Sequence, residues 1–131
     1  MVLIEQALSR AAIDAFYRVY NRLGYGFLES VYVGALVVEL QRDGHIVERE
    51  VPIEVAYDGV VLGFFRADLL VDRILILEVK ADSEFTAGPE RQLMNYLRCS
   101  ELEIGILLVF GMKPRFKRLI HTRDRKLTQN K

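Results

Sequence analysis

The chain has 131 residues, 51% of them hydrophobic, which suits one compact domain with a full core. It has no run of 18 apolar residues and no basic segment followed by a long apolar one near its start, so neither a membrane span nor a signal peptide is expected. Cys99 is the only cysteine, which excludes an internal disulfide and a thiolate metal cluster and favours a cytoplasmic location.

The net charge is zero, but the charges are unevenly distributed along the chain. Residues 1–110 contain 10 basic and 17 acidic side chains, whereas residues 111–131 contain 8 basic and 1 acidic. Such a basic density attracts phosphates, which makes Lys113, Arg115, Lys117 and Arg118 candidate nucleic-acid contacts. The alternative is a solvated terminus without a ligand. We expect one domain over residues 1–121 and a basic, disorder-prone tail over residues 122–131.

Apolar residues at helical spacing predict three helices. The first covers residues 4–23 and ends at Gly24 and Gly26. The second covers residues 27–40. Its predicted buried stripe consists of Leu28, Val31, Ala35 and Val38. The third begins at Pro89, a residue that fits the first turn of a helix, and continues through Cys99.

The strands are predicted from residues that alternate or form short apolar runs. Residues 46–57 and 60–70 flank Asp58-Gly59, a strong hairpin signal, and Gly63 is a candidate bulge. Residues 74–79 follow a second turn and read as a central strand that is covered on both faces.

Residues 104–110 form another continuous apolar run after the third helix, so they should lie parallel to the preceding strand. Residues 116–121 can add an edge strand. The order predicts an α/β fold with a mixed central sheet, in which an antiparallel three-strand meander, a helical crossover and a fourth strand are flanked by helices.

Two acids in the meander stand out. Asp68 and Glu78 are equally distant from Arg73, so a tight turn at residues 72–74 places them opposite each other on neighbouring strands. Like charges so placed destabilise a sheet, and an unpaired carboxylate beside apolar runs is costly. A hard cation such as Mg²⁺ or Mn²⁺ would offset both effects, so the two acids are predicted metal ligands.

Lys80 follows Glu78 by two residues, so the pleat places both side chains on one face of the strand. Two carboxylates that hold a divalent cation next to a lysine suit the hydrolysis of phosphodiesters, with the lysine as a catalytic residue. The alternative is that these residues form an ordinary ion-pair cluster with Arg66 or Arg73.

Three further residues are weaker candidates. Glu29 lies in the first turn of the second helix, where the helix dipole alone also favours an acid. Gln92 and Tyr96 are four residues apart on the third helix, so their polar ends share a face that can look toward the carboxylates.

These residues resemble a known family. Gly26, Glu29 and Tyr32 in GFLESVY match the motif of the GxxExxY proteins. The blocks that also match are VPIEVAYDGVVLGFFRADLLV, LEVKA, QLMNYL and GILLVF, and the likeness runs over residues 4–120. That family is similar to the PD-(D/E)XK nuclease-like superfamily, which implies a restriction-endonuclease-like core.

The resemblance also implies roles for the candidates. It makes Asp68 and Glu78 metal ligands, Lys80 the catalytic lysine and Glu29 an accessory acid, with Gln92 and Tyr96 flanking the site. The sequence departs from the pattern in three places. Ala67 stands for the proline of the superfamily name, Pro89 for an expected histidine, and Val33 for an acid often found after the motif tyrosine.

Together these features predict a Mg²⁺- or Mn²⁺-dependent nuclease domain that acts on DNA or RNA, either alone on one strand or as a homodimer on two. A non-catalytic adaptor that keeps the nuclease fold and binds nucleic acid or protein is the main alternative. A hydrolase of smaller phosphate esters is another. The sequence does not distinguish DNA from RNA.

Overall fold

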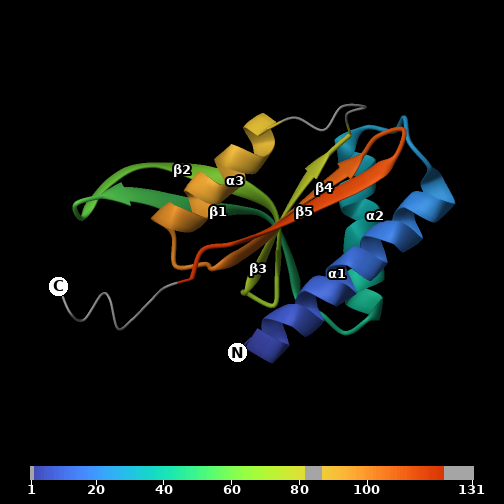
Figure 1. The fold of residues 1–131 in the computed structure, drawn as a ribbon, viewed down its shortest axis with the longest axis horizontal. Coiled ribbons are helices and arrows are strands. Elements are labelled where there is room, and N and C mark those ends of the chain that lie inside the picture. The colour runs from blue at the N-terminus through green and yellow to red at the C-terminus, as the bar shows by residue number, and fades with distance from the viewer. Residues whose placement is uncertain (1, 82–86, 123–131) are drawn as a thin grey trace.

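The computed structural model describes residues 2–81 and 87–122, which form a mixed five-stranded sheet with helices on both faces (Figure 1). The elements are α1 (Val2–Leu23), α2 (Glu29–Arg42), β1 (Val47–Tyr57), β2 (Val60–Val71), β3 (Leu75–Lys80), α3 (Ala87–Cys99), β4 (Ile104–Phe110) and β5 (Pro114–Ile120). The strands lie in the order β1-β2-β3-β4-β5, and only β3 and β4 are parallel. The predicted α/β fold is confirmed, including the parallel fourth strand and the edge strand.

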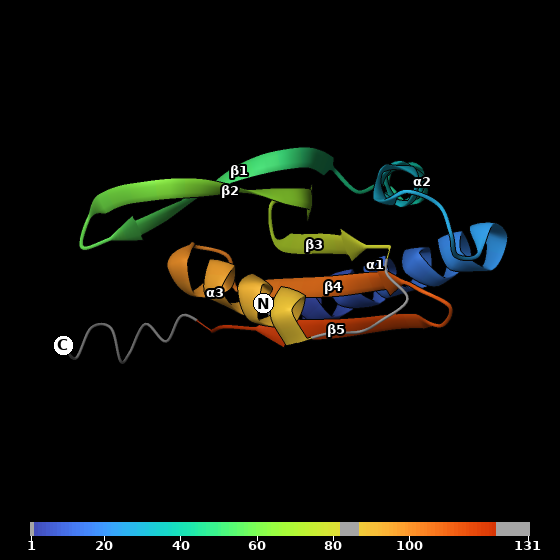
Figure 2. The ribbon, with the colours of Figure 1, turned by 90° about the horizontal axis from the view of Figure 1, so that it is seen from above.

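The sheet separates two hydrophobic clusters. Helices α1 and α2 cover one face and α3 covers the other (Figure 2). In β3, Leu75, Leu77 and Val79 pack toward α1 and α2, whereas Ile76 packs toward α3. The strand is therefore apolar on both faces, which explains why its sequence does not alternate. By the same alternation, Glu78 and Lys80 belong to the α3 face.

Helix α2 turns a different face to the sheet from the one predicted. The buried residues are Tyr32, Leu36 and Leu40, and the exposed members of the predicted stripe are Leu28, Val31 and Val38. Apolar residues occur on almost every side of this helix, so periodicity could not select the buried side. The selection comes from the sheet, because the Tyr32 ring stacks on Phe110 of β4 with ring centroids 4.0 Å apart.

The β1–β2 hairpin bends where it leaves the sheet. The β2–β3 pairing covers only Leu69 to Val71, so the rest of β2 pairs with β1 alone. Near this point, Glu50 of β1 has a φ of 49°, which is unusual for a residue with a side chain. Leu69 packs toward α1 and α2, whereas Ala67 packs toward α3. Odd-numbered residues of β2 therefore face α1 and α2 on one side of the bend and α3 on the other.

Two local predictions need correction. The register shift in the hairpin makes Leu62 the extra residue, because Val55 pairs with Gly63 and Ala56 with Val61, so Gly63 itself is not the bulge. Helix α3 begins at Ala87, two residues before Pro89, which remains within the first turn that proline tolerates.

Within the described ranges, no helix combines the length and the apolar character that a bilayer crossing needs. Most of the predicted tail, residues 123–131, lies outside the described residues, so its expected disorder stays a prediction.

Candidate active site

Asp68 and Glu78 lie side by side where β2 and β3 separate. The turn that joins the strands has positive φ at Asp72 (53°) and Arg73 (59°), the conformation of a tight hairpin turn. The antiparallel pairing ends at Leu69 and Leu77, and the two acids follow directly. The register predicted from the symmetry about Arg73 is therefore confirmed.

Beyond Leu69 and Leu77, the two carboxyl groups replace the backbone carbonyls as hydrogen-bond acceptors between β2 and β3. The backbone N–H of Asp68 donates to Glu78 Oε2 (3.0 Å), and the backbone N–H of Val79 donates to Asp68 Oδ2 (2.8 Å). Each carboxyl is thus anchored through one oxygen by the neighbouring strand. No hydrogen bond to the other oxygen of either group is recorded within the described residues. These two oxygens remain available for a ligand.

The environment of Glu78 disfavours its charge. Burial is the main cause, followed by the Asp68 carboxylate, and together they raise the pKa of Glu78 from 4.5 to about 7. The hydrogen bond from the Asp68 backbone and the nearby Lys80 lower this pKa, whereas Glu29 raises it further. Glu29, Asp68 and Lys80 therefore all lie within electrostatic reach of Glu78.

Lys80 has no ion-pair partner within 4.0 Å in the part of the chain that the structure describes, and the same holds for Asp68 and Glu78. Arg73 approaches Glu48 instead, at 3.7 Å. The alternative of an ordinary ion-pair cluster is therefore wrong for these residues. The Lys80 ammonium stays available near the carboxylates.

Glu29 connects the N-terminus of α2 to the end of β3. Its Oε2 accepts a long hydrogen bond from the backbone N–H of Ala81 (3.4 Å), the residue after Lys80. The side chain is also exposed, and the N-cap residue Leu28 makes no side-chain cap. The helix dipole can still favour an acid here, and the contact with Ala81 places the Glu29 carboxylate beside the end of β3.

Helix α3 contributes Tyr96 to the surroundings of the site. The Tyr96 ring stacks on Phe65 of β2 with centroids 3.3 Å apart. Burial, and then the charge of Glu78, raise the pKa of the Tyr96 hydroxyl, so this ring lies near Glu78. Gln92 is exposed, and no hydrogen bond joins it to the site within the described residues. Of the predicted pair on α3, only Tyr96 interacts with the carboxylates here.

The four basic candidates at the C-terminal side do not form one group. In the sheet, Leu107 of β4 pairs with Glu78 of β3 on one side and with Lys117 of β5 on the other. Val109 pairs in the same way with Lys80 and Arg115. Cross-strand partners share a face, so Lys117 and Arg115 lie on the site's face, two strands from β3. Arg118 points to the other face, where it donates to Ser9 Oγ of α1 (2.8 Å). Lys113 is exposed in the β4–β5 turn.

The donors fit one hard divalent cation held by two carboxylates. Glu78 and Asp68 each present one oxygen without a recorded hydrogen bond, and the raised pKa of Glu78 indicates that the second negative charge lacks compensation. Residues 2–81 and 87–122 contain no group of three or more His, Cys, Asp or Glu side chains placed to hold a metal. Water and substrate oxygens would complete the coordination, as Mg²⁺ commonly requires.

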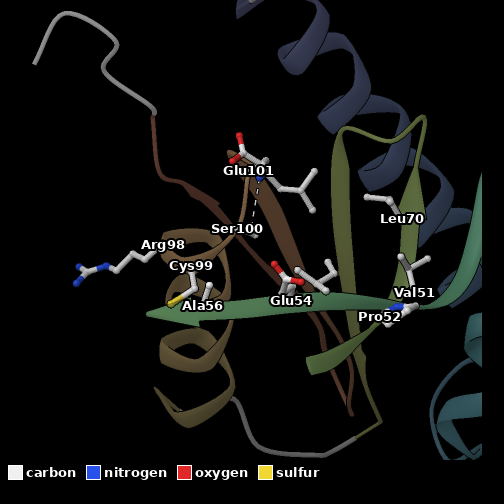
Figure 3. Close-up of a pocket in the computed structure, with 11 residues that line it drawn as sticks. Val51, Pro52, Glu54, Ala56, Leu70, Arg98, Cys99, Ser100 and Glu101 are labelled. Carbon is white, nitrogen blue, oxygen red and sulfur yellow. Dashed lines mark hydrogen bonds between the residues drawn. The ribbon is translucent and has the colours of Figure 1, made fainter. Parts of the chain in front are cut away.

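A pocket of about 550 Å³ lies elsewhere, between β1 and the C-terminal end of α3 (Figure 3). Glu54, Cys99 and Glu101 are among its lining residues, and Asp68, Glu78 and Lys80 are not. The carboxylate site is therefore separate from this pocket.

Several residues that shape the site were not predicted. The backbone N–H groups of Asp68, Val79 and Ala81 orient the three acids, and Phe65 positions Tyr96. Glu50 provides the bend beside Asp68. The sequence carries no local signal for these contacts, because each depends on segments that are far apart in the chain.

Comparisons with known proteins are informative at the family level. No curated protein matches the chain. Among solved structures, the one titled "Crystal structure of SSO0001" is similar over 75% of this chain, with a TM-score of 0.48 and 23% identity. The match covers 55% of that protein, so this chain corresponds to about half of its length. A family model described as PD-(D/E)XK nuclease superfamily matches residues 6–119, which include every candidate site residue named above. The chain therefore belongs to the PD-(D/E)XK nuclease superfamily.

Proposed function

We propose that this protein is a nuclease that hydrolyses phosphodiester bonds of DNA or RNA with Mg²⁺ or Mn²⁺. The observation that carries the proposal is the anchored pair Asp68 and Glu78 at the point where two strands separate. Lys80, which has no ion-pair partner among the described residues, lies on the same strand face as Glu78. Structural ion pairs would neutralise such a pair, and none does so within the described residues. Membership of a nuclease superfamily supports the same reaction class.

Each residue has a role that follows from its position. Asp68 and Glu78 would hold the cation, which supplies Lewis-acid polarisation of the phosphodiester when bound. Lys80 carries a positive charge to the scissile phosphate and stabilises the negative charge that develops in the transition state. Glu29 reaches the same strand end and serves as an accessory acid. Tyr96 and Gln92 flank the site from α3.

We also place the protein in the GxxExxY branch of the superfamily. The three motif residues have separate structural tasks that support this assignment. Gly26 has a φ of 104°, which favours glycine, and Glu29 accepts from Ala81. Tyr32 is fully buried, and its hydroxyl donates to the carbonyl of Gly24 (2.7 Å) and accepts from the N–H of Phe27 (3.2 Å).

The nucleic acid would contact the basic side chains on the site's side of the sheet. Arg115 and Lys117 share rows with Lys80 and Glu78 at a backbone separation of roughly 10 Å, two strand spacings. Long basic side chains at that distance can bind phosphates next to the scissile bond. Arg118 is left out of this proposal because Ser9 holds its guanidinium on the opposite face.

One observation favours the alternative of a non-catalytic adaptor. No three metal-ligating side chains come together within the described residues, and a two-carboxylate site binds a cation weakly without help from a substrate. An adaptor would retain the fold and the basic edge without turnover.

Metal titration and cleavage assays separate these functions. We expect saturable Mn²⁺ binding that Asp68→Asn and Glu78→Gln abolish, and metal-dependent cleavage of DNA or RNA. Lys80→Met should retain metal binding but lower cleavage by about 100-fold or more, since it removes a charge that acts in the transition state. Glu54→Gln, which removes an exposed carboxyl of β1, is the matched control.

Two outcomes would reject the nuclease. Metal binding without cleavage of any single- or double-stranded polymer would support the adaptor. Cleavage that survives Asp68→Asn and Glu78→Gln would come from another site or from a contaminant.

A further inference from the structure

The segment before Glu29 exposes aromatic and apolar side chains beside the site. Tyr25 is 57% exposed, Phe27 45% and Leu28 76%. Exposed apolar side chains that lie together on a protein surface often mark a binding site. Phe27 stands two residues before Glu29, whose carboxylate contacts the N–H that follows Lys80, so this apolar segment borders the proposed catalytic residues.

The segment is held in a defined shape. Gly24 and Gly26 have φ values of 70° and 104°, and the N–H of Gly24 donates to the carbonyl of Tyr20 (2.8 Å). The Tyr32 hydroxyl bridges Gly24 and Phe27, and the edge of one ring of the Phe27–Tyr32 pair meets the face of the other at 87°. A flat side chain fixed in this way loses little conformational freedom when a ligand stacks on it.

The β4–β5 turn adds positive charge at the same end of the molecule. The Tyr20 hydroxyl lies 2.8 Å from the carbonyl oxygen of Gly111 and 2.7 Å from that of Met112, which ties the turn to the end of α1. Both views place this turn beside the α1–α2 segment (Figures 1 and 2). Met112 is 65% exposed and Lys113 follows it. Residues 111–122 contain no acid, so the β4–β5 turn itself contributes only positive charge.

We infer that Tyr25, Phe27 and the β4–β5 turn form a platform for a single-stranded nucleic acid, with unpaired bases stacked on the rings and phosphates on Lys113. The combination of flat apolar groups and adjacent cations matches a ligand that exposes both base faces and regular negative charges. A duplex hides its base faces within the stack, so it gains nothing from the rings. This inference rests on the proposed function, because it names the substrate class of that site.

The test measures binding apart from cleavage. In EDTA, where metal-dependent cleavage cannot proceed, the full chain is titrated with a fluorescent oligothymidine, its ribo counterpart and a duplex. We expect the single strands to bind more tightly than the duplex. Tyr25→Leu and Phe27→Leu keep an apolar side chain but remove the ring, and each should weaken single-strand binding about tenfold while the duplex affinity is unchanged.

Tyr57→Leu is the matched control, because Tyr57 is 68% exposed but lies at the tip of the β1–β2 hairpin. Thermal unfolding of each variant checks the fold, since Phe27 contacts Tyr32. A strand that contains 2-aminopurine gives a second readout, because its fluorescence should be quenched on the native protein and recover with Phe27→Leu. A duplex that binds as tightly as the single strand would overturn the inference, and so would leucine variants with native affinity.

These experiments distinguish failure of the platform from failure of the proposed nuclease function. If the single strand binds and depends on Tyr25 and Phe27 but no metal supports its cleavage, the nuclease assignment fails and the platform remains. If cleavage depends on Asp68 and Lys80 but not on the rings, the platform fails and the nuclease remains.

Discussion

The carboxyl of Glu78 should make stability depend on pH in an unusual direction. Its folded pKa of about 7 lies above the ordinary 4.5, so between these pH values the folded protein keeps a proton that the unfolded chain releases. The contribution to stability is thus fully present below pH 4.5 and is lost as the pH rises through 7. In the absence of metal and above pH 7, Glu78→Gln should therefore have a larger free energy of unfolding than the native protein, by on the order of 1 to 3 kcal/mol.

This advantage should shrink as the pH falls through 7 and disappear below pH 4.5, where the Glu78 carboxyl is protonated in the folded and in the unfolded protein. Urea unfolding of both proteins across the pH range, in EDTA, provides the measurement. Glu54→Gln controls for the loss of one carboxyl. A variant that is less stable than the native protein at every pH would show that the Glu78 carboxylate is stabilised, in conflict with its burial beside Asp68.

The placement of the candidate site residues was predictable from the sequence. The equal spacing of Asp68 and Glu78 about Arg73 determines their register once the turn forms, and the pleat places Lys80 beyond them. The orientation of the carboxyl groups was not predictable. It depends on backbone N–H groups that become free only because β2 leaves β3 at this point.

At the scale of the strand, the bend at Glu50 is a feature that substitutions can test. A residue with a side chain at a φ of 49° costs about 1 kcal/mol, and a β-branched residue costs more. We expect Glu50→Val to be less stable than Glu50→Gly by about 1 to 2 kcal/mol in urea unfolding. If the valine protein is equally stable, the strand does not adopt this conformation in solution.

For the helix α2, the structure and the periodicity give opposite predictions. Leu36 is fully buried, so Leu36→Ala should cost about 2 to 5 kcal/mol. Val38 is 47% exposed, so Val38→Ala should change the free energy of unfolding by less than about 0.5 kcal/mol. Urea unfolding distinguishes the two faces, and a large loss at Val38 would restore the stripe predicted from the sequence.

The elements were easier to predict than the faces they present. Helices, strands and their order follow from spacing and turn residues, and the parallel β3–β4 pair follows from the helix between them. The buried side of α2 does not, because its sequence is apolar all round and Phe110, more than 70 residues away, selects Tyr32. The split of the basic group follows from the alternation of β5, which places Arg118 on the face opposite to Arg115, and the pairing with β4 decides which of the two faces Glu78 shares.

Over the whole molecule, this split predicts different effects for neighbouring arginines. Arg115 and Lys117 lie on the site's face, so Arg115→Gln and Lys117→Gln should each lower the slope of log affinity against log salt concentration by about 0.7 to 1, the value for one lost phosphate contact. Arg118→Gln should leave the slope unchanged. It should instead reduce stability by about 1 kcal/mol, because the hydrogen bond to Ser9 is lost.

The measurement is the affinity for one oligonucleotide at several salt concentrations, with unfolding of each variant in parallel. Because the three residues belong to the same short strand, general effects of charge removal are shared and only the face differs. Equal slopes for all three variants would mean that nucleic acid senses only the net charge of β5. A smaller slope for the Arg115 and Lys117 variants alone would instead indicate that the bound strand runs across the sheet, from the basic edge toward Glu78 and Lys80.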